Sequence, residues 1–255
     1  MKYNEEINKD IIKENIYTRR ILIDWIMQIQ MEKINEKEYN NIYILINIYD
    51  RIISKEKKIP QEKIQLVGIA GLMIVLKHEE DYEEDRISIR EAEELSMGQY
   101  GEKEIRGIEK RILEICEYKI MIENTGGQIL EKKIGNRKIK EEERRKMNIM
   151  IIIIYLTEEY LEEMEEKIEK IIRIVIGKEE TRCECLEEMK RKIREEIERI
   201  KKVKQCKYLK KIIENEGIEE IVKEEKEKRK RRKRRKEIVR EGVKKYKERK
   251  RRKEI

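Results

Sequence analysis

Apolar residues recur along most of the chain at the spacing of buried helix faces. Positions i, i+1, i+4, i+5 and i+8 share one side of an α-helix, and the first such stripe consists of Ile21, Leu22, Trp25, Ile26 and Ile29. Residues 42–53 carry a second stripe of Ile, Leu and Tyr. The two patterns predict amphipathic helices that each bury one side against a common core.

Three more helices are predicted before residue 120. Nearly every position of 63–77 is apolar or small, and Pro60 suits the first turn of this helix; a helix that is apolar all round belongs among other helices. Ser88 and Glu91 have the spacing of a capping box for a short helix that ends near residue 97. Residues 102–116 repeat the amphipathic pattern, and their acidic start suits the positive end of a helix dipole.

After a break at residues 124–127, the second half continues with helical periodicity. A buried helix is predicted over 147–161, another over 168–176 that ends at Gly177, and a long amphipathic helix over 186–200. Proline occurs once and glycine 11 times in 255 residues, while the helix formers Glu, Lys and Arg abound. The chain is therefore predicted to be all-α.

Charge is divided unevenly along the chain. The net charge is +8, yet residues 223–255 contain 20 Lys and Arg against 7 Asp and Glu, whereas the preceding 222 residues contain 44 against 49. A mildly acidic body thus carries a strongly basic tail, in which residues 228–236 are all Lys or Arg. Such a tail is read as a nuclear import signal, a nucleic-acid-binding arm or compositional drift, and the cluster fits an import receptor best.

Nothing in the chain points to catalysis or to a cofactor. His78 is the only histidine and has no triad motif beside it, and glycine-rich phosphate loops are absent. Cys183 and Cys185 lack a second pair and a nearby histidine, so no metal site is predicted. Four cysteines without a signal peptide, and apolar runs too short to cross a bilayer, predict an intracellular protein, nuclear and cytoplasmic, that binds no membrane.

Four segments occur in the order and at the spacing of a known family. They read TRRILIDWIMQIQ, NIYILINIYDRIIS, KIQLVGIAGLMIVLKHEEDYEE and EIRGIEKRILEICEYKI, and together they cover residues 17–122. Gln65 and Lys77 stand twelve residues apart, as the corresponding Gln and Lys do in that family. The segments resemble the cyclin box of the A- and B-type cyclins, whose five helices agree with the number predicted from periodicity. In the second half, MIIIIYLTEEYL and KQCKYLKKI bear a fainter likeness to the family's second box.

The resemblance implies an all-α fold of two tandem five-helix cyclin-box domains, the second divergent, followed by the basic tail. The expected divisions are an N-terminal helix or leader in 1–17, the first box in 18–125, the second in 137–222 and the tail in 223–255. It also implies a regulatory subunit, not an enzyme, that binds a cyclin-dependent serine/threonine kinase and activates it in cell-cycle control. A cyclin pushes the kinase helix that bears the catalytic Glu inward, which completes the Lys–Glu pair needed for phosphoryl transfer.

The same resemblance assigns roles to individual residues. Lys77 and Glu109 are expected to anchor the kinase backbone, since hydrogen bonds that involve an ionised group are the stronger kind; without the resemblance they would read as solvated charges at helix ends. The expected apolar contacts around them are Ile53, Ile112 and Leu113. Arg19 and Asp50 match an internal ion pair of the family that ties the first helix of the box to the second.

A second site of the family is a shallow apolar groove on the first helix, which binds substrates or inhibitors with an Arg-x-Leu motif. The matching positions are Ile21, Leu22, Trp25, Gln28 and Gln65. Gln28 stands where a Glu normally meets the substrate Arg, and Thr18 stands where a Met is usual, so docking is expected to be weak or altered. Core packing alone also explains Trp25.

Two alternative functions remain open from the sequence. Cyclin-box proteins also serve transcriptional kinases, and a related two-box fold occurs in general transcription factors. A helical nucleic-acid-binding protein that acts through its basic tail is the alternative from another class, and nucleic acid is not expected to bind elsewhere on the chain. The QLVG and DW segments favour the cell-cycle branch.

Overall fold

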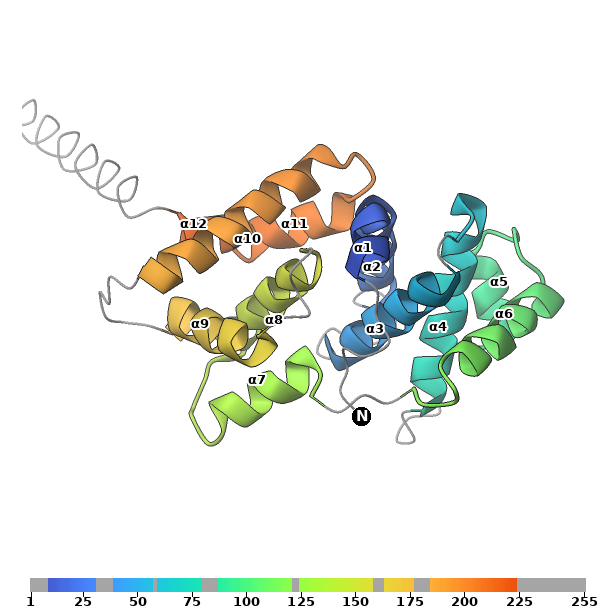
Figure 1. Ribbon diagram of the computed structural model, residues 1–255, viewed down its shortest axis with the longest axis horizontal. Coiled ribbons are helices and arrows are strands. Elements are labelled where there is room, and N and C mark those ends of the chain that lie inside the picture. Colours follow the sequence, from blue (N-terminus) through green and yellow to red (C-terminus); the bar gives the residue numbers. More distant parts are fainter. Residues whose placement is uncertain are drawn as a thin grey trace, which may run out of the picture.

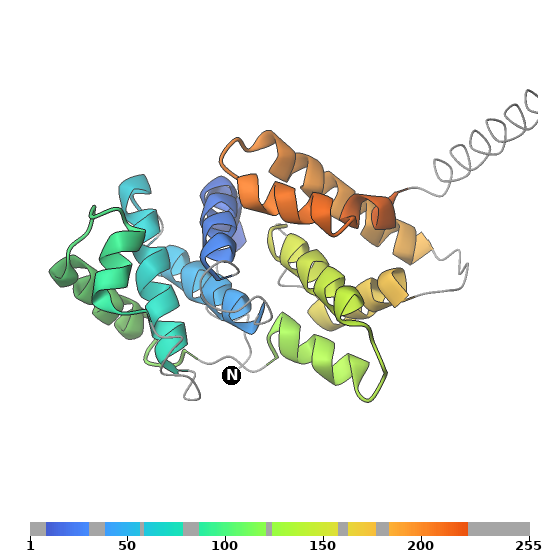
Figure 2. The same cartoon turned by 180° about the vertical axis from the view of Figure 1, so that it is seen from behind.

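The protein is all-helical over the residues that its computed structural model describes, which are 9–30, 39–56, 59–78, 87–120, 124–157, 163–176 and 184–223. The first group of helices comprises α1 (Lys9–Glu14), α2 (Ile16–Ile29), α3 (Tyr39–Glu56), α4 (Ile64–His78), α5 (Ile89–Leu95) and α6 (Glu102–Ile115). The second comprises α7 (Gly126–Ile134), α8 (Glu141–Tyr155), α9 (Met164–Ile176), α10 (Glu184–Lys202), α11 (Lys207–Asn215) and α12 (Ile218–Val222). Figures 1 and 2 show the two groups side by side. Within the first group, α1 and α2 lie on the side that faces the second group.

The central helix of the first group is α4. Of its 15 residues 12 are buried, and it packs against α2, α3 and α6. This agrees with the sequence pattern, because a helix that is apolar all round has no side that tolerates water. The side of α4 that faces α5 and α6 forms a small second core cluster with them, made of Leu66, Ile69, Met73, Ala92, Tyr100 and Ile105.

The predicted capping box at the start of α5 is present. The Glu91 N–H donates to Ser88 Oγ at 3.2 Å, and the Ser88 N–H donates to Glu91 Oε2 at 2.8 Å. Together the two bonds satisfy N–H groups that have no partner inside the helix. The next helix, α6, begins at Glu102 as predicted.

Apolar periodicity does not predict α7, which starts directly after the break. Thr125 and Gln128 form a capping box: the Gln128 N–H donates to Thr125 Oγ1 at 3.2 Å, and the Thr125 N–H donates to Gln128 Oε1 at 3.1 Å. Gly126 lies so close to α8 that a Cβ there would stand 2.8 Å from Ile151 Cγ2 and 3.0 Å from Tyr155 Cε2. The glycine that reads as a break in the sequence therefore allows α7 and α8 to approach each other closely.

The bounds of α8 differ from the predicted 147–161. The helix begins at Glu141, where the Lys140 N–H donates to Glu143 Oε2 at 3.1 Å, and three glutamates fill its first turn. Acidic side chains favour that end of a helix, but they carry no apolar period, so the pattern places the start too late. The helix ends at Tyr155; residues 158–162 lie outside the described residues, as does Gly177.

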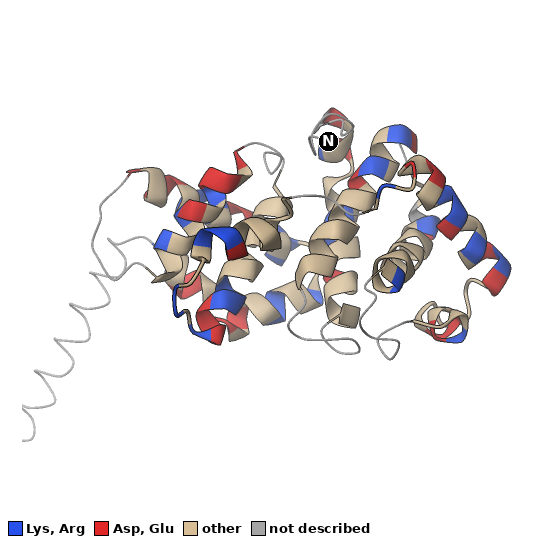
Figure 3. Cartoon of the chain, turned by 90° about the horizontal axis from the view of Figure 1, so that it is seen from below, with Lys and Arg blue, Asp and Glu red and all other residues tan. Residues whose placement is uncertain are grey.

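One hydrophobic core extends through both groups of helices. Its buried members come from every labelled helix except α5, whereas contacts between independent domains are usually smaller and more polar. The two groups therefore form one packed body, and charged residues of both signs are interspersed over its outer helices in the view of Figure 3.

The division into boxes at 18–125 and 137–222 stays a prediction, and α7 packs against α8 and α9 although it precedes residue 137. Most of the predicted leader and tail, including residues 228–236, lies outside the described residues. None of the helices described combines the length and the apolarity needed to cross a bilayer.

Candidate functional site

Lys77 and Glu109 meet at the edge of the contact between α4 and α6. Lys77 lies in the last turn of α4 and Glu109 lies midway along α6. The Lys77 ammonium donates a hydrogen bond to Glu109 Oε1, and their side chains are 44% and 13% exposed. The Lys77 side chain is thus open to water while that of Glu109 is largely covered, and an ion pair with one solvated partner adds little to folding stability. Both charged groups can therefore turn to a partner surface at small cost to the fold.

The three predicted apolar contacts do not share one environment. Ile53 and Ile112 are 0% and 1% exposed and belong to the core, whereas Leu113 is partly exposed. In this conformation a partner can reach Leu113 but not the other two. Ile53 and Ile112 instead belong to the hydrophobic core that α3 and α6 share.

The C-terminal end of α6 is held against α3 by two basic residues. Arg51 donates from Nη2 to the Cys116 carbonyl at 2.9 Å and from Nη1 to the Lys119 carbonyl at 2.7 Å. Lys55 donates from Nζ to the Ile115 carbonyl at 2.8 Å. Carbonyl groups at this end have no partner inside the helix, and cations there are also favoured by the helix dipole. The two side chains thereby fix the residues that follow α6.

Tyr118, which sequence reasoning did not single out, is exposed at this end of α6. Its N–H donates to the Leu113 carbonyl at 2.8 Å, its φ is +57°, and 69% of the residue is exposed. Aromatic residues are enriched where protein surfaces bind one another. The sequence offered a signal in the tyrosine of EICEYKI, but only the fold shows that it points away from the core. We define Lys77, Glu109, Leu113 and Tyr118 as the α4–α6 surface.

The structure brings the five predicted groove residues onto two neighbouring helices, with Ile21, Leu22, Trp25 and Gln28 on α2 and Gln65 on α4. Leu22 is buried, while Trp25 is partly exposed and packs against both core clusters. At Gly68 a Cβ would stand 2.6 Å from Leu22 Cδ1 and 3.2 Å from Trp25 Cζ3. Trp25 thus has a packing role, and only its exposed part could contact a peptide bound in the predicted groove.

Arg19 and Asp50 form a buried bidentate pair between α2 and α3. Arg19 Nε lies 2.7 Å from Asp50 Oδ1 and Arg19 Nη2 lies 2.9 Å from Oδ2, and both residues are fully buried. Arg19 Nη1 also donates to the Tyr155 carbonyl at the end of α8. Such forked contacts suit the planar guanidinium. Arg19 therefore joins α2 to α3 and also to the second group of helices.

Two more charged residues of α2, neither singled out from the sequence, reach the second group. Arg20 donates from Nε to Glu196 Oε1 at 2.6 Å and from Nη2 to Oε2 at 3.0 Å. Asp24 accepts the backbone N–H groups of Tyr208 at 3.3 Å and Leu209 at 2.5 Å. Burial raises the pKa of the Asp24 carboxyl, although these backbone donors act in the opposite direction.

Asp24 caps the N-terminus of α11 from another helix. The residue directly before α11, Cys206, forms no side-chain cap of its own. Asp24→Ala is expected to destabilise the chain by about 2 kcal/mol, since it removes a cap and leaves N–H groups without an acceptor. Hydrogen exchange should show faster exchange at Tyr208 and Leu209. Asp24→Asn keeps one acceptor oxygen and should lose less; equal losses in the two variants would contradict a capping role.

Two features of the described residues bear on their chemistry. Burial raises the pKa of the Cys206 thiol to about 12, so this thiol stays protonated at neutral pH and is a poor nucleophile. Among the residues described, no three of His, Cys, Asp and Glu gather closely enough to hold a metal ion. The α4–α6 surface offers two charged groups and two apolar ones, which suits binding to another protein.

Comparisons with known proteins agree with this picture. The family model of the cyclin N-terminal domain matches residues 3–121. "G2/mitotic-specific cyclin-B" from Hydra viridissima is 32% identical over 106 residues, which are 41% of this chain and 25% of that protein. "G2/mitotic-specific cyclin-1" from Antirrhinum majus is 35% identical over 104 residues, which are 41% of this chain and 21% of that protein. The matched region thus spans about a quarter of the length of these relatives.

A solved structure extends the likeness beyond the first box. The X-ray structure of a viral cyclin from herpesvirus saimiri superposes with a TM-score of 0.53 and covers 85% of this chain and 86% of its own. At 15% identity the match concerns the fold alone. It nevertheless includes the second group of helices, which the sequence relates only faintly to the family.

Proposed function

Because this chain belongs to the cyclin family through the N-terminal domain in residues 3–121, we propose that it is a non-enzymatic regulatory subunit that binds and activates a cyclin-dependent protein kinase in cell-cycle control. The single observation that carries the proposal is the partly exposed Lys77–Glu109 pair, whose two residues stand at the positions that the resemblance gives to the kinase anchors. The mitotic names of the relatives support the cell-cycle branch.

On this proposal the α4–α6 surface docks beside the kinase active site. Lys77 donates to carbonyl groups of the kinase backbone and Glu109 accepts from its N–H groups, so each exchanges its present partner for a new charge-assisted hydrogen bond. Leu113 and Tyr118 supply the apolar contact beside them. Binding then favours the kinase state in which the Lys–Glu pair for phosphoryl transfer is complete.

Phosphorylation of a generic substrate by a cyclin-dependent kinase tests the proposal. The intact chain is expected to activate the kinase, and Lys77→Ala/Glu109→Ala is expected to lower its apparent affinity for the kinase at least tenfold, because charge-assisted bonds are lost. Removing both partners leaves no lone charge behind, so the helical circular dichroism should not change.

Glu102→Ala/Arg106→Ala is the matched control, since it removes an exposed ion pair that lies within α6, the helix that carries Glu109. It should activate as the intact chain does. Deletion of residues 223–255 should also preserve activation, whereas a nucleic-acid-binding protein acting through its tail would lose its function. Absence of activation and of co-elution with any cell-cycle kinase would refute the proposed function, but it would not affect the assignment of the fold.

A further inference from the structure

A group of lysines at the turn between α10 and α11 lacks acidic partners. Residues 199–211, which span this turn, contain seven Lys or Arg and no Asp or Glu. Four of these side chains are exposed, namely Lys202, Lys204, Lys207 and Lys211. The described part of the chain offers no hydrogen bond or ion pair to their ammonium groups. We call these four residues the α10–α11 lysine patch.

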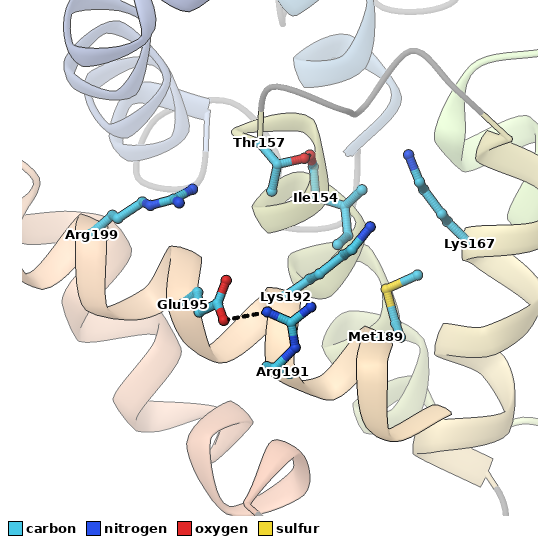
Figure 4. A pocket seen from close by; sticks show the side chains of 8 residues that line it. All are labelled: Ile154, Thr157, Lys167, Met189, Arg191, Lys192, Glu195 and Arg199. Atoms are coloured by element: carbon cyan, nitrogen blue, oxygen red, sulfur yellow. Dashed lines mark hydrogen bonds and ion pairs between the residues drawn. The ribbon is translucent and has the colours of Figure 1, made fainter. Parts of the chain in front are cut away.

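Other cations of α10 do have carboxylate partners. Arg191 Nη1 lies 2.6 Å from Glu195 Oε1, a contact drawn in Figure 4. Lys201 Nζ lies 3.2 Å from Glu198 Oε1 and 2.9 Å from Glu219 Oε1. Pairing is therefore common along this helix, and the lysine patch departs from it at the end of α10 and in the turn that follows.

Helix electrostatics explains only one part of the patch. Lys202 lies in the last turn of α10, where the helix dipole favours a cation. Lys207 is instead the first residue of α11, where the dipole disfavours a cation, and the first turn of α11 contains no acidic residue. Lys211 follows Lys207 by four positions, so the two like charges are neighbours on one face of the helix and repel each other. The arrangement lowers stability on its own, and an anionic partner would offset that loss.

An exposed aromatic side chain lies beside the patch. The Tyr17 hydroxyl donates to Gln205 Oε1 at 3.0 Å, and 47% of Tyr17 is exposed. Gln205 lies in the turn, between Lys204 and Lys207. Aromatic residues are enriched where proteins bind one another. The turn thus offers an apolar ring next to its charges, as a protein-binding surface does.

The charge of the surroundings favours an acidic polypeptide over a nucleic acid. Outside residues 199–211, residues 1–222 contain 37 Lys and Arg against 49 Asp and Glu. A nucleic acid carries negative charge along its whole length, so it would extend from the patch over an acidic body that repels it. A short acidic peptide would meet the lysines alone.

The spacing of the lysines suits a short extended segment. Lys207 and Lys211 are separated by about 6 Å along the axis of α11, at about 1.5 Å per residue. In an extended peptide the side chains on one face recur at intervals of about 7 Å. We infer that the α10–α11 lysine patch binds a short segment of another protein in which acidic residues recur at every second position.

Fluorescence anisotropy with the full-length chain tests this inference. The probe is a labelled peptide in which Glu alternates with Ser, and the comparison peptide has Gln in place of every Glu. Saturable binding of the Glu peptide is expected, with an affinity that falls as salt is added. The Gln peptide should bind much more weakly. A labelled single-stranded oligonucleotide of thymidines is titrated as a third probe.

The variant Lys202→Gln/Lys204→Gln/Lys207→Gln/Lys211→Gln is expected to bind the Glu peptide at least about tenfold more weakly. A contact between solvated charges changes affinity about twofold, and four such contacts multiply to more than tenfold. The midpoint of urea unfolding should not fall, because the four side chains are exposed and the repulsion between Lys207 and Lys211 is removed. This readout separates a binding defect from a folding defect.

The matched control removes the same number of lysines from the basic tail, in Lys228→Gln/Lys230→Gln/Lys233→Gln/Lys236→Gln. It should bind the Glu peptide as the intact chain does. The inference is overturned by absence of saturable binding, by equal binding of the Gln peptide, by equal losses in the two variants, or by tighter patch-dependent binding of the oligonucleotide than of the peptide. The measurement contains no kinase, so its outcome is independent of the proposed kinase activation.

Discussion

Arg19→Met is expected to destabilise the folded chain by about 3–5 kcal/mol, because it leaves the Asp50 carboxylate buried without its bidentate partner. Methionine has a similar length and no charge, so the variant tests the lost pairing more than lost volume. The Tyr155 carbonyl also loses its Arg19 donor, which adds to the effect. A typical domain is stable by only about 5–15 kcal/mol. Urea unfolding followed by circular dichroism measures the change.

Arg106→Met is the matched control for Arg19→Met. Arg106 pairs with Glu102 on the outside of α6, where both side chains are more than half exposed, and such pairs are worth about 1 kcal/mol or less. The double variant Arg19→Met/Asp50→Leu should recover much of the lost stability, since replacing a buried ion pair by apolar side chains is often neutral. If Arg19→Met costs no more than Arg106→Met, the buried pair does not hold the fold.

The sequence predicted those parts of the fold that depend on local signals. The capping residues Ser88 and Glu91 start α5 where expected, and the apolar segment 63–77 became the central helix α4. In contrast, α7 is short and glycine-initiated, and only its packing against α8 explains it. Apolar periodicity could not place the start of α8, because its first turn is entirely acidic.

For the candidate site too, the sequence predicted what depends on local signals and missed what depends on contacts between distant parts of the chain. The family resemblance singled out Lys77 and Glu109, and the fold pairs them at the edge between α4 and α6. Exposure, however, depends on the packing of whole helices, so Ile53 and Ile112 turned out to be buried and Tyr118 exposed. Nothing local in the sequence pointed to the partners of Arg20 and Asp24, which lie 176 and 185 residues away along the chain.

The contacts of α2 explain why its charged residues matter to both groups of helices. Arg19 reaches α3 and α8, Arg20 reaches α10, and Asp24 caps α11. Each contact is directional and buried, so together they fix the orientation of the second group relative to the first. On the proposed function, α2 would thereby keep the second group in place while α4 and α6 contact the kinase.

Arg20→Met is expected to destabilise the chain by about 3 kcal/mol at neutral pH, and the loss should shrink as the pH falls. Glu196 is fully buried, and burial raises the pKa of its carboxyl although Arg20 and Arg199 lower it. Removing Arg20 takes away one of these opposing effects, so the pKa of Glu196 in the folded variant rises further. A carboxyl whose folded pKa lies above its unfolded value contributes stability that is present at low pH and is lost as the pH rises through the folded pKa.

The difference between the intact chain and Arg20→Met should therefore be small near pH 4.5, the ordinary pKa of this carboxyl, and should reach its full size by about pH 8. Urea unfolding across this range measures it. Arg199→Met is the control, because Arg199 contacts the same carboxylate but is 52% exposed, and it should cost about 1 kcal/mol or less. A loss from Arg20→Met that does not change with pH would contradict this account. The lost stability would then come from the packing of the Arg20 side chain and not from its charge pair with Glu196.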